Sequence, residues 1–171
     1  ALSTYANCQA RFFYEKVMSI NTDPEPTDAI DAATTGSIVH SAMMQLYLPD
    51  PDYRGKLLST PIVVQPDDIK TILRSPGKIE DCVRRLVNEL HFHLPPDDLD
   101  RSLSGSPAHE AAMLCKLIEN ILKRDLRMAP FRLYGCEVEG RIAVPLTDGR
   151  NVNFAFAIDR IDRPGDSGDA P

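Results

Sequence analysis

The sequence has no close pair of cysteines, no long hydrophobic run and no excess of positive charge. Its four cysteines stand at positions 8, 82, 115 and 136 without a C-x-x-C pair, which excludes a zinc finger and a dense disulfide framework and favours a reducing compartment. No apolar run approaches the roughly 18 residues of a membrane-spanning helix, and residues 1–4 lack the charged and apolar regions of a signal peptide. We therefore expect a soluble, cytoplasmic chain with no membrane partner.

Length and net charge limit the number of domains and the possible partners. The 171 residues suffice for one domain with one core, and the net charge of −6 gives no general indication of a nucleic-acid partner. Residues 123–163 differ, because eight Lys and Arg face six Asp and Glu there, a net charge of +2. The chain starts without Met, and residues 164–171 have the composition of a loop or disordered tail. We expect a piece of a longer protein.

Hydrophobic periodicity predicts helices first and strands last. Apolar residues recur at helical spacing over about 3–18, 32–48, 66–75, 79–90 and 107–127, with residues 53–65 irregular. Alternation then favours strands at 131–144 and 152–161, joined by a hairpin turn at Asp148-Gly149. A lone two-stranded hairpin is marginal. The fold class we predict is α/β (α+β), a helix-rich N-terminal part followed by a β-hairpin of a truncated sheet.

One histidine stands out on the second predicted helix. His40 falls on the flank of the apolar stripe, and Gly36 lies one turn earlier on the same side. A glycine there leaves the space beside the imidazole open to something other than a side chain. The plain alternative is a histidine at the core boundary beside a glycine of the N-terminal turn.

Carboxylates mark both predicted strands. Glu137 and Glu139 share a face of the first strand at spacing i, i+2. Asp159 ends an otherwise apolar strand, where burying a carboxylate is costly unless it binds a cation or is hydrogen-bonded. The hairpin brings the two strands together, so these groups and an imidazole could meet at a hard divalent cation. A salt-bridge ladder with Arg132, Arg141 and Arg160 is an equal alternative from spacing alone.

Four segments, in order, resemble the nuclease domain of RecB/AddB-type proteins in the PD-(D/E)xK nuclease superfamily. Residues 3–14 resemble its opening S-x-x-x-x-Y-x-x-C-P-x-x-F-x-Y, with Gln9 in place of Pro. Gly36-Ser37-Ile38-Val39-His40 matches its G-x-x-x-H helix. Residues 129–137 resemble the approach to a glutamate on the first strand, and Ala157-Ile158-Asp159-Arg160-Ile161-Asp162 matches G-x-I-D-R-I-D. The resemblance covers nearly the whole chain.

The resemblance implies a restriction-endonuclease-like core over residues 1–163 and hydrolysis of DNA phosphodiesters. By it, His40 and Asp159 are metal ligands and Glu137 is a helper carboxylate near the metal or the attacking water, so all three are catalytic residues. The implied cofactor is Mg²⁺ or Mn²⁺. The implied partners are DNA and the helicase or other subunits of a repair complex. An iron–sulfur cluster through Cys8 would require further cysteines in a parent protein, and we favour a packing role for Cys8.

Two departures from the family pattern matter. Phe156 replaces the glycine before x-I-D and is expected to crowd the backbone near the site. The family's next strand carries D-Y-K, and no Asp-x-Lys follows Asp159 here. We therefore expect a partial domain that is inactive alone. The alternatives are a catalytically inactive nuclease-fold module that binds DNA or acts as a scaffold, and a helical interaction domain with no site. The last fails if His40, Glu137 and Asp159 meet in space.

Overall fold

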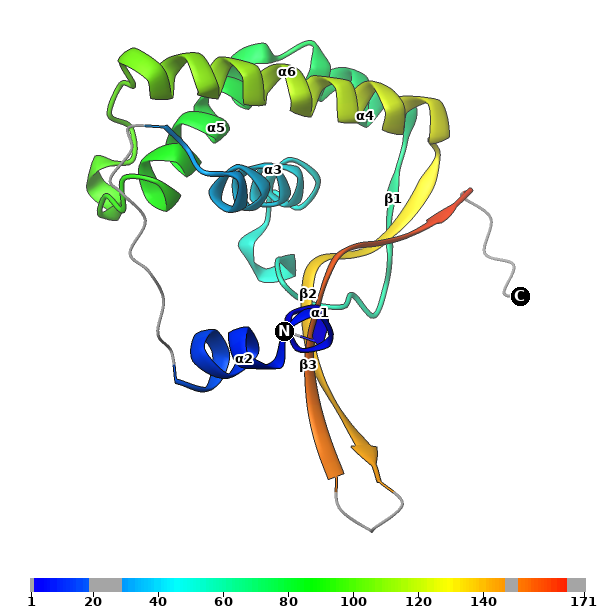
Figure 1. The fold of residues 1–171 in the computed structure, drawn as a ribbon. Coiled ribbons are helices and arrows are strands. Elements are labelled where there is room, and N and C mark those ends of the chain that lie inside the picture. The colour runs from blue at the N-terminus through cyan, green and yellow to red at the C-terminus, as the bar shows by residue number, and fades with distance from the viewer. Residues whose placement is uncertain (1, 19–28, 147–150, 166–171) are drawn as a thin grey trace.

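The computed structural model describes residues 2–18, 29–146 and 151–165. The helical elements are α1 (Leu2–Asn7), α2 (Gln9–Phe12), the π-helix Phe13–Val17, α3 (Ala32–Tyr47), α4 (Pro66–Leu73), α5 (Pro76–Leu90) and α6 (Gly105–Met128), with short 3₁₀ turns at Pro51–Tyr53 and Pro96–Asp98. The strands are β1 (Ile62–Val64), β2 (Phe131–Pro145) and β3 (Asn151–Pro164). Helices first and a long hairpin last confirm the predicted α/β class (Figure 1). None of the described helices has the length and apolar character that a membrane span requires.

The core lies where α3 packs against α5 and α6. Asp31 caps α3 by accepting hydrogen bonds from the backbone N–H groups of Ala33 and Thr34. The stripe predicted for this helix is buried or half-buried, with Ile38 and Ala42 fully covered. The stripe of α5 is buried in the same way, at Ile79, Val83, Leu86 and Val87. Burial of these amphipathic faces is the main force that holds the helices together.

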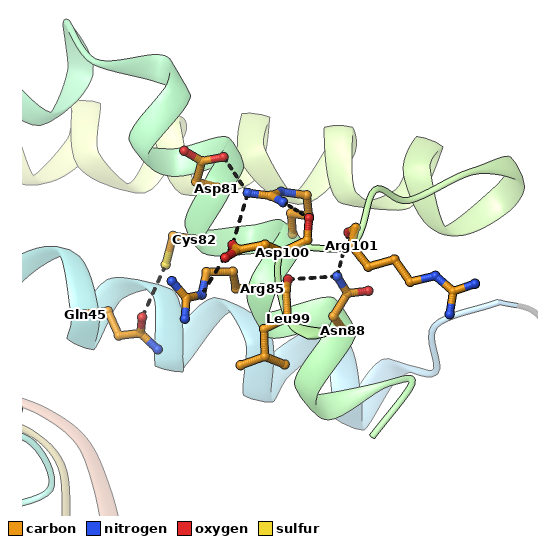
Figure 2. Close-up of polar contacts among 9 residues, drawn as sticks. Gln45, Asp81, Cys82, Arg85, Asn88, Leu99, Asp100 and Arg101 are labelled. Carbon is orange, nitrogen blue, oxygen red and sulfur yellow. Dashed lines mark hydrogen bonds and ion pairs between the residues drawn. The ribbon is translucent and has the colours of Figure 1, made fainter. Parts of the chain in front are cut away.

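The connection from α5 to α6 is tied down by polar contacts. Asn88 of α5 is buried and its Nδ2 donates hydrogen bonds to the carbonyls of Leu99 (2.9 Å) and Arg101 (2.7 Å) (Figure 2). The Asp100 carboxylate lies 3.9 Å from Nε of Arg85. Because the backbone groups of this loop are satisfied, α6 starts at a fixed place relative to α5.

The sheet has three antiparallel strands in the order β1-β2-β3. The expectation that residues 53–65 are irregular is wrong at Ile62–Val64, which pair with Leu133, Arg132 and Phe131. Three residues are too few to show a period of two. The β2–β3 hairpin itself is long, and its far half extends away from the helices (Figure 1). The predicted Asp148-Gly149 turn lies outside the described residues.

A register shift divides β2. Leu133 pairs with Asp162 and Gly135 pairs with Ile161, so Tyr134 is an extra residue, a β-bulge. The buried positions change from Phe131 and Leu133 to Cys136 and Val138 across it. At Gly135 a Cβ atom would lie 2.6 Å from Cγ2 of Val138 and 2.7 Å from the carbonyl oxygen of Lys56. Only glycine lets the loop at Lys56 approach the strand so closely.

The N-terminal segment differs from the single helix expected at 3–18. It is divided into α1, α2 and the π-helix, and α1 already begins at Leu2. Cys8 is exposed, so the packing role expected for it is wrong, whereas Cys136 is buried. Tyr5 and Phe12 still form the expected face, as an edge-to-face ring pair 5.4 Å apart.

Candidate metal centre

His40, Glu137 and Asp159 meet at one point. Nδ1 of His40 lies 3.2 Å from Oε1 of Glu137 and 3.4 Å from Oδ1 of Asp159. One potential ligand atom from each of the three residues lies within 4.8 Å of the other two. It is the one such group of three or more metal-ligating side chains in the part of the chain that the structure describes. His40 thus forms a cluster with two residues that follow it by 97 and 119 positions in the sequence.

Each side chain reaches the cluster from a different element. His40 projects from the middle of α3, which contacts β2. Glu137 stands on β2 between the pairs Cys136–Arg160 and Val138–Ile158, so it lies across from Asp159 on β3. The backbone of Glu137 has a φ of +53°, a left-handed conformation that costs a non-glycine residue roughly 1–2 kcal/mol. Such strain in a polar residue is characteristic of functional sites.

The cluster has the chemistry that a divalent cation needs. Oε1 of Glu137 is buried and makes no hydrogen bond, because its approach to His40 lacks hydrogen-bond geometry. A buried carboxylate oxygen without a partner is costly, and a cation between the three side chains would remove that cost. Two carboxylates and one imidazole are ligands of Mg²⁺, Mn²⁺ and related ions. The residues present therefore fit such an ion.

The cluster is open to solvent on one side. The Asp159 side chain is 69% exposed and that of Glu137 33%, so Asp159 does not carry the cost of a carboxylate buried in an apolar strand. At Gly36, one turn before His40, an added Cβ would meet nothing within 4 Å. The space beside the imidazole is therefore open, as its sequence position suggested.

The comparison with protein families settles the wider relationship. A family model of the PD-(D/E)XK nuclease superfamily matches residues 1–170. The chain belongs to this superfamily. No curated protein and no solved structure matches it. The match and the convergence of the three side chains are independent observations, since one rests on sequence and the other on geometry.

Two expectations for the nuclease-family chain need correction. Glu139 does not share the site of Glu137; it is exposed and lines an open groove with Arg141 and Phe156. From Glu139 onward the side chains of β2 are exposed or half-buried, because the far part of the hairpin extends away from the helices (Figure 1). Phe156 lies on Gly140 of the facing strand, where a Cβ would be 2.3 Å from its ring. A ring laid over a cross-strand glycine stabilises the hairpin.

The predicted arginine ladder is also different in the structure. Arg160 turns to Asp125 on α6 and to Asp162 on its own strand. Asp125 is only 3% exposed, and Tyr47 donates its hydroxyl to the same carboxylate at 2.7 Å. Sequence reasoning missed this group, although a signal existed: Asp125 continues the buried stripe of Leu114, Ile118 and Leu122 on α6. A charged residue at a core position of a helix needs a buried partner.

Proposed function

We propose that the chain carries part of the active site of a Mg²⁺- or Mn²⁺-dependent nuclease that hydrolyses DNA phosphodiester bonds. The observation that supports the proposal most is the convergence of His40, Glu137 and Asp159 within 4.8 Å in a chain of the PD-(D/E)XK nuclease superfamily. In this proposal His40 and Asp159 hold the metal, and Glu137 lies beside the metal or the attacking water.

Each side chain has a separate task. A divalent cation at such a site supplies a more acidic bound water and neutralises charge on the scissile phosphate. Asp159 faces solvent and contributes its carboxylate from the open side. Glu137 keeps Oε1 buried without a hydrogen bond, ready to orient a water or accept its proton. His40 would offer Nδ1 to the metal, since this atom lies within 3.4 Å of both carboxylates.

We further propose the RecB/AddB type within the superfamily. The supporting observations are the order and spacing of the four segments, from residues 3–14 through Gly36-x-x-x-His40 and Glu137 to Ile158-Asp159-Arg160-Ile161-Asp162. The proposal includes DNA and the helicase or other subunits of a cytoplasmic DNA repair complex as partners.

The site proposed here is incomplete within the 171 residues. No lysine occurs after Lys123, so no Asp-x-Lys segment follows Asp159. In this class of site a lysine orients or activates the nucleophile, so we propose that residues 1–171 alone have little or no nuclease activity. An Asp-x-Lys segment within about 30 residues of continued reading frame, enough for one more strand and its turn, would complete the site.

The test is DNA degradation in Mg²⁺ or Mn²⁺ by the chain with and without that continuation. We expect cleavage only from the extended chain, and its loss in Asp159→Asn and His40→Ala variants that still unfold cooperatively. Glu139→Gln is the matched control, a carboxylate of the same strand outside the cluster, and it should retain activity. Robust Mg²⁺-dependent degradation by residues 1–171 would contradict the inactivity of the shorter chain. Unchanged activity of the extended Asp159→Asn variant would contradict the site.

The alternative to this proposal is a catalytically inactive nuclease-fold module that binds DNA or acts as a scaffold in a helicase–nuclease complex. Absence of an Asp-x-Lys segment from the continued reading frame would favour it. The same assay then separates the two proposals, because an inactive module would leave the DNA uncleaved.

A further inference from the structure

An ion pair inside the fold holds the residue that follows Asp159. Arg160 donates through Nη1 to Oδ2 of Asp125 and through Nη2 to Oδ2 of Asp162, the second at 2.7 Å. Its guanidinium also lies over the ring of Phe131, 4.6 Å from the ring centre. The Arg160 side chain is 21% exposed and that of Asp125 4%. Strand β3 is therefore tied to α6 next to the metal cluster.

Helix α3 takes part in the same group. The hydroxyl of Tyr47 donates to Oδ2 of Asp125 at 2.7 Å, and its ring lies 5.3 Å from the guanidinium carbon of Arg160. Tyr47 follows His40 by seven residues, which is two helical turns, so both side chains lie on one side of α3. The helix thus meets two consecutive residues of β3, Asp159 through His40 and Arg160 through Tyr47.

The charges of this group are stable. Burial and the bond to Asp125 raise the pKa of Tyr47 above its usual range. Burial opposes the charge of Arg160, but the hydrogen bond to Asp125 and the negative charges of Asp125 and Asp162 together outweigh it and raise the pKa of the guanidinium. Tyr47 therefore stays a hydrogen-bond donor and Arg160 a cation at any working pH, so the contacts do not change with protonation.

Asp159 depends on its backbone for its position. Its side chain is 69% exposed, so packing does not hold the carboxylate. The adjacent residue, by contrast, is fixed from α3, α6 and its own strand. Groups that fix the orientation of a metal ligand commonly change metal affinity by 10–100-fold when they are altered.

We propose that Arg160 is a positioning residue for Asp159. Its contacts with Asp125, Asp162 and the two rings set β3 at the place along α3 where the Asp159 carboxylate meets His40. This inference rests on the proposed function, since it concerns the metal ligand named there. It predicts that a change at Arg160 lowers the occupancy of the metal even though Arg160 never contacts it.

The experiment uses Mn²⁺ as the probe and NMR of the four histidines in the 171-residue chain. Bound Mn²⁺ broadens nearby imidazole signals, and for weak binding the broadening is proportional to occupancy. We expect selective broadening of His40, with His91, His93 and His109 as internal references. Arg160→Lys keeps the charge opposite Asp125 but loses the planar fork, and it should reduce the His40 broadening about tenfold at equal Mn²⁺.

Controls separate this inference from the proposed function. Ile79→Val makes a small core cavity away from the cluster and should lower the melting temperature without changing the broadening. Asp159→Asn should abolish it. The positioning role alone would be overturned if the His40 signal of Arg160→Lys broadens to within twofold of the parent chain while that of Asp159→Asn does not broaden. The proposed site, and this inference with it, would be overturned if the His40 signal broadens equally in the parent chain and in Asp159→Asn. The same conclusion would follow if the His40 signal of the parent chain does not broaden at all. If Arg160→Lys fails to fold, Asp162→Asn replaces it, with an expected reduction of about threefold.

Discussion

At the level of one residue, the backbone of Glu137 is strained at the place where its side chain joins the cluster with His40 and Asp159. Its φ of +53° suits glycine better than any residue with a Cβ. We expect Glu137→Gly to be more stable than Glu137→Ala by about 1 kcal/mol, measured by urea unfolding. Glu139 is the matched control on the same strand, where Glu139→Gly should be less stable than Glu139→Ala by about 0.5–1 kcal/mol. The same order of stabilities at both positions would contradict the strain at Glu137.

Gly135 is the second residue whose identity the structure explains. A methyl group there would meet Val138 and the Lys56 carbonyl at under 3 Å, and the backbone carbonyl cannot rotate away. We expect Gly135→Ala to lower the free energy of unfolding by about 1–3 kcal/mol.

A second glycine gives the matched control for this prediction. Gly36 lies inside α3, and an added Cβ meets nothing within 4 Å. Gly36→Ala should therefore stabilise the chain by about 0.5–1 kcal/mol. If thermal unfolding shows Gly135→Ala to be neutral, the loop at Lys56 is not packed on β2 as described.

At the level of elements, one carboxylate joins two helices. Glu110 of α6 accepts hydrogen bonds from Oγ of Ser106 and from the backbone N–H of Ile30, just before α3, both at 2.7 Å. The bond from Ser106 and then the bond from Ile30 hold the pKa of Glu110 below its usual range. This stabilisation is present above about pH 4.3, the pKa of an unfolded glutamate, and is lost as the pH falls through the lower pKa of the folded chain.

The pH prediction follows from that sign. Between about pH 5 and pH 3 the free energy of unfolding should fall less steeply in Glu110→Gln than in the parent chain, as measured by urea unfolding across that range. Ser106→Ala removes the larger of the two causes and should give an intermediate slope. Parallel curves for the parent and Glu110→Gln would show that this contact does not contribute.

The elements were predictable to the extent that their periodicity is long. The apolar stripes of α3, α5 and α6 predicted these helices and most of their buried residues. Each helix has 15 to 24 residues, so the apolar spacing repeats over several helical turns. Strand β1 has three residues and owes its existence to pairing with β2, which no local pattern shows. The bulge at Tyr134 was missed for the same reason, since a register depends on both strands.

At the level of the whole molecule, the meeting of His40, Glu137 and Asp159 was predictable through the family resemblance and not through spacing. Spacing left an arginine ladder as an equal alternative for Glu137 and Asp159. The structure instead brings His40 to both carboxylates and gives Arg160 to Asp125. Helix α3 and the hairpin are far apart in the sequence, so only the packed fold decides which side chains meet.

Metal affinity is a property of this whole arrangement. His40 and Asp159 supply two ligands where a hard cation takes about six donors, some of them waters. We expect millimolar Mn²⁺ to leave the melting temperature of the 171-residue chain unchanged, because weak binding adds little free energy. Submicromolar affinity in a calorimetric titration would contradict the proposed incomplete site.

The bulge on β2 lets this strand carry one residue more than strict alternation allows while the same face stays buried. Its extra residue, Tyr134, moves the buried positions from 131 and 133 to 136 and 138. Without the bulge, the same residues in strict alternation would turn Cys136 and Val138 to the face opposite Phe131 and Leu133. Loss of a single codon at Tyr134 would remove the extra residue, and strict alternation would then keep Cys136 and Val138 on the buried face. Natural relatives of this chain should therefore either keep the extra residue with its bulge or lack both, with apolar residues at the positions of Cys136 and Val138 in each case.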